Sequence, residues 1–142
     1  MLTESILKNM FYDLLGDYTT SSNGNRAYLG VISSISGSNY IEPTDSSYTR
    51  VQCGIRYSGS CEGWTFTYST DGTKATLTAT NNTEIHLPET TQAWETINYF
   101  GIYSLASGGT PRYYGTLKTS ITPAAKTVVV MKKGALVITI EG

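Results

Sequence analysis

Apolar residues repeat with a helical period at the start of the chain. They recur one, four and five positions apart, at Ile6, Leu7, Met10, Phe11, Leu14 and Leu15. Thr3 is suited to cap the first turn, and Gly16 is suited to end the helix. The pattern predicts one amphipathic helix within residues 1–16, whose wide apolar stripe must lie on a core or on a partner.

From residue 26 onward, apolar and polar residues alternate in short runs separated by turn residues, which is typical of β-strands. The clearest case is a hairpin over residues 64–79 that turns at Asp71 and Gly72. Residues 36–47 are predicted to be a loop, with Pro43 as a strand breaker. Further strands are predicted within residues 26–35, 48–57, 85–87, 97–105, 112–117, 126–131 and 135–140.

About eight or nine strands with frequent turns favour an antiparallel fold over alternating helices and strands. We therefore predict an all-β protein, an antiparallel β-sandwich of the jelly-roll kind with one N-terminal helix. A chain of 142 residues is the size of a single domain. We expect one domain over residues 1–142, with the helix in residues 1–16 and the sandwich in residues 26–142.

The composition supports this fold and limits the partners. Charged residues make up 15% of the chain, and 14 Gly and 11 Tyr accompany many Thr and Ser. The net charge of −1 argues against binding to nucleic acid, which requires several cationic side chains on the phosphates. The apolar runs are too short for a membrane-spanning helix, and the N-terminus lacks the features of a secretion signal. We expect neither a nucleic acid nor a membrane as partner.

The residues that commonly carry metals or catalysis are scarce. With one histidine, His86, and two cysteines, Cys53 and Cys61, a metal site is not expected, and no cofactor is predicted. Free thiols are favoured for Cys53 and Cys61, although their spacing also allows a disulfide. His86 shares the polar face of a short strand with Glu84, which indicates a surface position. A small hydrolase built on His86 is the least supported alternative, and we predict no catalytic residues.

Aromatic residues are concentrated in residues 98–117. Because neighbouring residues of a strand face opposite sides, one of Tyr113 and Tyr114 must leave the core, and the same holds for Tyr99 and Phe100. Rings and helical apolar residues that leave the core could contact another chain. The candidate interface residues are Ile6, Leu7, Met10, Phe11, Tyr99, Tyr113 and Tyr114. Exposed rings could also stack on sugars, and Trp64 and Trp94 are further candidates for that role.

Three blocks of the sequence resemble a known group of proteins. They are "LTESILKNMFYDLLG", "YTRVQ", and the region from "EIHLPETTQAWETINYFGIYSLASGGTPRYYGTL" to "KKGALVITI". Together they resemble the short structural proteins of tailed-bacteriophage virions, of the tail-fibre or minor structural (decoration-like) family.

The resemblance implies a non-enzymatic virion protein that is made in the cytoplasm of the bacterial host. It implies assembly on the particle with other phage proteins of the capsid or tail, and with further copies of the chain as a homo-oligomer. Capsid decoration and association with a tail fibre are both compatible with it. The alternative hypothesis is a glycan-binding module that attaches the phage to the host surface.

Overall fold

The computed structural model describes residues 1–16, 25–57 and 59–142. Within these ranges the chain forms one helix and 12 strands. The elements are α1 (Glu4–Leu14), β1 (Asn25–Ile32), β2 (Ser34–Ser36), β3 (Asn39–Ile41), β4 (Val51–Tyr57), β5 (Ser60–Glu62), β6 (Trp64–Thr70), β7 (Ala75–Asn81), β8 (Ile85–His86), β9 (Ile97–Tyr103), β10 (Tyr113–Ile121), β11 (Val130–Met131) and β12 (Val137–Glu141). The prediction of an all-β fold with one N-terminal helix is confirmed.

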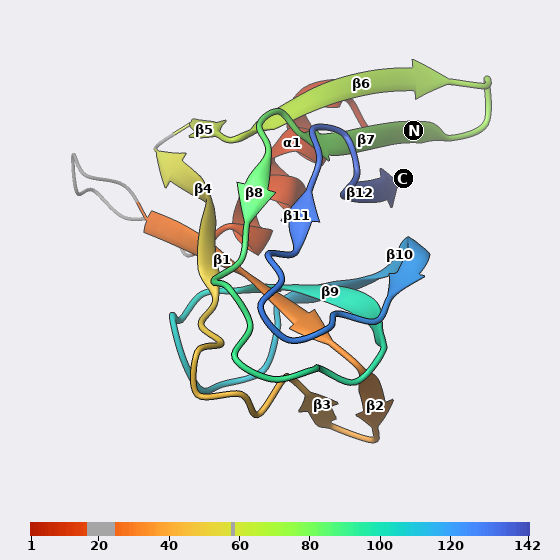
Figure 1. Cartoon of the computed structure of the whole chain (residues 1–142). Coiled ribbons are helices and arrows are strands. Elements are labelled where there is room, and N and C mark those ends of the chain that lie inside the picture. The colour runs from red at the N-terminus through yellow and green to blue at the C-terminus, as the bar shows by residue number, and fades with distance from the viewer. Residues whose placement is uncertain (17–24, 58) are drawn as a thin grey trace.

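The strands form a curled five-stranded sheet and three smaller sheets, and the strand pairs are antiparallel. The large sheet has the order β10-β9-β1-β4-β5, and the smaller ones are β12-β7-β6, β11-β8 and β2-β3. In Figure 1, α1, the β12-β7-β6 sheet and both termini lie at one end of the molecule. The β2–β3 hairpin lies at the opposite end.

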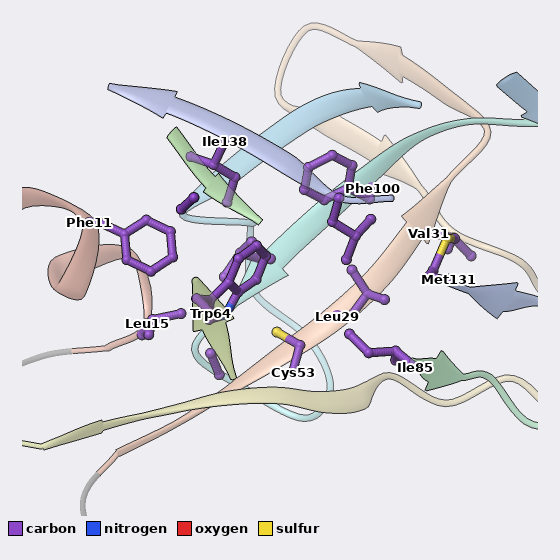
Figure 2. Close-up of a cluster of buried hydrophobic side chains, with 14 of the residues drawn as sticks. Phe11, Leu15, Leu29, Val31, Cys53, Trp64, Ile85, Phe100, Met131 and Ile138 are labelled. Atoms are coloured by element: carbon purple, nitrogen blue, oxygen red, sulfur yellow. The ribbon is translucent and has the colours of Figure 1, made fainter. Parts of the chain in front are cut away.

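The apolar stripe of α1 forms part of the core. The helix begins where the Thr3 hydroxyl accepts a hydrogen bond from the Ile6 backbone N–H at 3.3 Å, and it ends before Gly16, whose φ is 139°. Phe11 is fully buried, and its ring meets those of Trp64 and Phe66 edge to face, with centroids 5.3 and 5.1 Å apart. Figure 2 shows Phe11 and Trp64 side by side in this core.

The predicted hairpin is present as β6 and β7. Its register pairs Phe66 with Ala79 and Tyr68 with Leu77. The Asp71 carboxylate accepts hydrogen bonds from the backbone N–H groups of Thr73 and Lys74 at 3.0 and 2.9 Å, which stabilise the turn. Local alternation and turn chemistry were therefore sufficient to predict this element.

One prediction about the end of the chain needs correction. The strand expected over residues 126–131 is reduced to Val130–Met131, because the preceding backbone bonds to the loop at Leu87–Thr90 instead. β11 pairs with β8, whereas β12 pairs with β7, so the last two strands belong to different sheets. These pairings join segments far apart in sequence, and local alternation carries no information about them.

The segment predicted as a loop over residues 36–47 contains part of a small hairpin. β2 and β3 pair in register from Ser34 with Ile41 to Ser36 with Asn39. Gly37 begins the two-residue turn with a φ of 62°, a conformation that favours glycine.

In the described part of the chain no helix is long and apolar enough to cross a membrane.

Candidate functional site

The face of the five-stranded sheet that is turned away from the core carries a tyrosine ring above two glycines. Gly30 of β1 and Gly101 of β9 are direct partners in the register. A Cβ atom on either glycine would lie 2.7 or 2.8 Å from Cε1 of Tyr103. Only glycine therefore leaves room for the ring at this point of the sheet.

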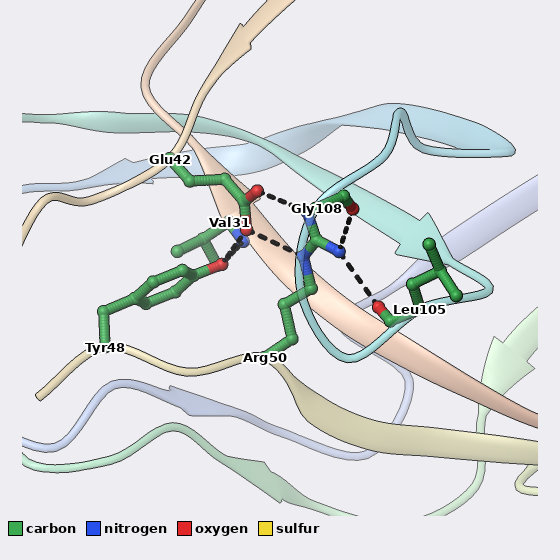
Figure 3. Close-up of polar contacts among 6 residues, drawn as sticks. All are labelled: Val31, Glu42, Tyr48, Arg50, Leu105 and Gly108. Atoms are coloured by element: carbon green, nitrogen blue, oxygen red, sulfur yellow. Dashed lines mark hydrogen bonds and ion pairs between the residues drawn. The ribbon is translucent and has the colours of Figure 1, made fainter.

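A buried arginine, Arg50, lies over this ring, and Figure 3 shows its hydrogen bonds to Glu42, Leu105 and Gly108. Cζ of Arg50 lies 3.4 Å from the centroid of Tyr103, a cation–π contact. Arg50 donates two hydrogen bonds to the Glu42 carboxylate, Nη2–Oε1 at 2.6 Å and Nε–Oε2 at 3.0 Å. The Tyr48 hydroxyl donates to Oε2 of Glu42 at 2.5 Å and accepts from the backbone N–H of Val31 at 3.1 Å. We call Glu42, Tyr48, Arg50 and Tyr103 the arginine cluster.

The electrostatics of the arginine cluster favour one protonation state. Burial raises the pKa of Tyr48 and Tyr103, and the negative charge of Glu42 raises both further. Burial opposes the charged form of Arg50, but the hydrogen bonds and charge of Glu42 outweigh it and raise the pKa of Arg50. The arginine thus stays charged and the tyrosines stay neutral across the physiological pH range.

Arg50 also fixes the loop between β9 and β10. Its Nη1 donates to the carbonyl oxygens of Leu105 at 2.9 Å and Gly108 at 2.7 Å. Gly108 and Gly109 both have positive φ, 71° and 68°, which lets the loop turn tightly around the guanidinium group. The loop is thereby held in one conformation while the Leu105 side chain remains 54% exposed.

A second buried charge, Asp45, organises a neighbouring loop. Its carboxylate accepts hydrogen bonds from the backbone N–H groups of Ser47, Thr91 and Gln92, from the Thr91 hydroxyl, and from Nε1 of Trp94 at 3.0 Å. The Thr91 hydroxyl and the other donors hold the pKa of Asp45 well below its usual range, although burial acts in the opposite direction. The Asp45 carboxylate therefore stabilises this loop through hydrogen bonds within the chain.

Three tyrosines from different strands form an exposed aromatic group. Tyr40 of β3 and Tyr99 of β9 both contact the ring of Tyr114 on β10, with centroids 5.7 and 6.0 Å away. Tyr114 is 46% exposed, and the other two rings are half-buried. We call Tyr40, Tyr99 and Tyr114 the tyrosine patch.

The structure separates the candidate interface residues of α1 into two kinds. Leu7 and Phe11 are fully buried in the core of the chain itself. Ile6 and Met10 lie one turn apart on the outer side of the helix and are 45% and 43% exposed. Of the predicted helical positions, Ile6 and Met10 are thus the ones that a partner could reach.

The aromatic candidates are divided in the same way. Tyr113 is half-buried and packs against Phe100, with ring centroids 6.1 Å apart, whereas Tyr114 faces outward. Tyr99 is half-buried on the side opposite to the buried Phe100. Trp64 and Trp94 are both buried in the core, which removes them as a platform for sugars.

The residues considered for catalysis lie along an open groove of about 660 Å³ between β4, β5 and residues 82–86. His86 is exposed, as predicted, and its Nε2 lies 2.7 Å from Oε1 of the exposed Glu84. Cys53 and Cys61 are free thiols, and burial raises the pKa of each to about 12. Both therefore remain protonated and weakly nucleophilic at neutral pH. In the three described segments, no three side chains of the metal-binding types form a group.

The sequence interpretation did not identify the arginine cluster. Glu42 and Arg50 are close in sequence, but the two carbonyl groups that Arg50 binds lie more than 50 residues away. A usable signal was present in the glycines at positions 30 and 101, because glycine inside a strand often marks a close approach of another group.

In the comparison with protein families, the chain matches a family described as "Podophage GP4 fiber I protein gp80". The match covers residues 4–139, which is nearly the whole chain and includes in full all but one of the 12 strands in the described residues. The chain belongs to this family. The resemblance to fibre-type structural proteins of tailed phages is therefore confirmed. A search of curated proteins gives no match.

Proposed function

We propose that this fibre-family chain is a non-enzymatic structural component of a phage particle that docks on other virion proteins. The observation that carries the proposal is the family match over residues 4–139. The family description names a fibre, which favours a fibre location over decoration of the capsid.

The exposed side of α1 supports docking through one end of the molecule. Ile6 and Met10 are apolar and exposed, and α1 lies at the same end as both termini (Figure 1). The backbone N–H of Leu2 donates to the carbonyl oxygen of Gly142 at 3.4 Å, which keeps the two termini together. Apolar residues at the centre of a contact supply much of its affinity.

The buried charged side chains bond to other groups of the same chain, which supports a structural role. Glu42 and Arg50 neutralise each other and hold a loop, and the Asp45 carboxylate is taken up by five donors from the backbone and side chains. Groups engaged in this way are not available to transfer a proton to a substrate.

Replacing the exposed pair on α1 tests the proposal. The double variant Ile6→Asp/Met10→Asp should remain folded, because both side chains are exposed, but should be depleted from purified particles by about tenfold or more. The matched control is Val128→Asp, which alters an apolar residue of similar exposure, 43%, outside α1. Quantitative mass spectrometry of purified virions provides the measurement.

Two results would count against the proposal. Absence of the parent chain from purified virions would exclude a virion role. Incorporation of the double variant at the parent level would exclude docking through α1 and would leave the virion role intact.

A second candidate function is binding to a glycan of the host surface. The tyrosine patch favours it, because exposed aromatic rings that do not serve the core commonly mark a binding surface. The patch includes β3, which lies at the end opposite to α1 and the termini (Figure 1). Screening the purified chain on an array of bacterial surface glycans tests this function, and an array without any bound glycan would remove it.

A further inference from the structure

We propose that the tyrosine patch binds the apolar face of a neutral pyranose ring, with Tyr114 as the stacking platform. The inference rests on the second candidate function, glycan binding, and assigns its site and the class of sugar. It is independent of docking through α1.

The geometry of the patch provides a supported and accessible ring. Tyr114 lies between Tyr40 and Tyr99, at interplanar angles of 56° and 86° to them, and is the most exposed of the three. The backbones of β9 and β10 are paired here, with Tyr99 opposite Thr116 and Tyr114 opposite Gly101. A ring supported by neighbours and by a paired strand loses little conformational freedom when a ligand stacks on it.

Polar groups surround the platform. Within the parts of the chain that the structure describes, the hydroxyl groups of Tyr40, Tyr99 and Tyr114 make no hydrogen bond. Each can donate and accept one, and the exposed Thr116 adds a further hydroxyl on the same face of β10. A pyranose presents C–H groups on its faces and hydroxyl groups around its rim. The patch matches this arrangement, because the tyrosine rings form an apolar surface and their hydroxyl groups and that of Thr116 form a polar border.

The charge of the patch selects the class of sugar. The three rings are neutral, and Lys118 is the charged residue on the outward side of β10. An acidic polysaccharide or a nucleic acid would be expected to contact several cations. We therefore infer a neutral sugar.

The area of the patch favours a small ligand over a protein. A tyrosine side chain buries about 150–250 Å² when it is covered completely, so three rings that are already half-buried or more leave about 300 Å² or less. A standard protein contact takes about 800 Å² from each partner. Weak binding to one sugar is sufficient on a particle that carries many copies, because multivalent attachment multiplies the affinity.

Saturation-transfer NMR on the purified full chain tests the inference. The probes are methyl glycosides of glucose, galactose, mannose and N-acetylglucosamine, together with glucuronic acid as an acidic probe. Saturation of the aromatic protons should transfer to the ring C–H groups of at least one neutral glycoside. Tyr114→Ala should reduce this transfer at least about tenfold, whereas Tyr114→Phe should largely retain it because the ring remains. Val128→Ala, outside the patch, should leave it unchanged.

Each other outcome overturns a defined part of the inference. Transfer to neutral sugars that survives in Tyr114→Ala would place the glycan site elsewhere and would leave the second candidate function standing. Transfer to the acidic probe alone would overturn the neutral class. No transfer to any probe would overturn the site, and an empty glycan array would then remove glycan binding as a whole. Loss of virion incorporation in Tyr114→Ala would assign the patch to a protein partner instead.

Discussion

At the scale of single residues, the arginine cluster shows how one buried charge is made stable. Arg50 is nearly inaccessible to solvent, yet its guanidinium group has a carboxylate, two carbonyl groups and an aromatic ring as partners. A buried charge that is paired and largely hydrogen-bonded is tolerated, whereas removal of one partner leaves the other charge buried and unpaired. We therefore expect that replacing one residue of the ion pair strongly lowers the stability of the folded chain.

We expect Arg50→Met to lower the free energy of unfolding by about 3 kcal/mol, because Glu42 is left with an uncompensated charge. The double variant Arg50→Met/Glu42→Gln should recover a substantial part of the loss. Urea denaturation of the parent, both single variants and the double variant gives the coupling energy. Single-variant losses that simply add in the double variant would show that the ion pair is not coupled.

Asp45 predicts a dependence of stability on pH. Its pKa is lowered in the folded chain, whereas a carboxyl group in the unfolded chain titrates near pH 4. The stability that it contributes is therefore complete above about pH 4 and is lost progressively as the pH falls below that value. Asp45→Asn should be less stable than the parent at pH 7, but its stability should fall less between about pH 4 and pH 2.

The measurement is the urea midpoint of both proteins across this pH range. The pH dependence of the stability of Asp71→Asn serves as a comparison. The pKa of Asp71 is also lowered, to about 2, but Asp71 lies in an exposed turn. Identical slopes for Asp45→Asn and the parent would mean that Asp45 does not cause the acid sensitivity.

At the scale of elements, α1 is fixed to the sheets by its buried side chains, and Phe11 has the largest of those that are fully buried. Phe11 contacts Trp64 and Phe66, and no part of it is exposed. Phe11→Ala should lower the free energy of unfolding by about 3–5 kcal/mol through the cavity that it leaves. Met10→Ala, one residue away but exposed, should change stability by less than about 1 kcal/mol. Thermal melts followed by circular dichroism compare the two, and equal melting temperatures would contradict the packing of α1.

The elements that sequence reasoning predicted well are those specified by neighbouring residues. The helix has a cap, a period and a stop at Thr3 and Gly16, and the β6–β7 hairpin has alternation and a turn at Asp71. β5 and the β2–β3 hairpin were missed because three-residue strands are too short to show a period. The division of β11 and β12 between two sheets was missed because it depends on contacts with β8 and β7, which are distant in sequence.

The same distinction applies to the candidate surfaces. Alternation along β10 predicted that one of Tyr113 and Tyr114 faces outward but left open which one, and the structure shows that it is Tyr114. The contact of Tyr114 with Tyr40 could not be predicted, because it depends on how the β2–β3 hairpin folds back toward β10. The burial of Leu7 and Phe11 and the exposure of Ile6 and Met10 depend on how α1 is rotated against the core, which the wide apolar stripe left open.

At the scale of the whole molecule, the two proposed surfaces lie toward different ends. α1, Leu2 and Gly142 are at one end, and the turn of the β2–β3 hairpin, which precedes Tyr40 of the tyrosine patch, is at the other (Figure 1). A folded domain fused after Gly142 should therefore block incorporation into virions and leave saturation transfer to neutral glycosides intact. The same domain inserted between Gly37 and Ser38, in the exposed β2–β3 turn, should have the reverse effect. Mass spectrometry of purified particles and NMR of the purified chains measure the two outcomes separately. Incorporation of the C-terminal fusion at the parent level would show that the end that carries the termini does not face the particle. It would thereby contradict docking through this end.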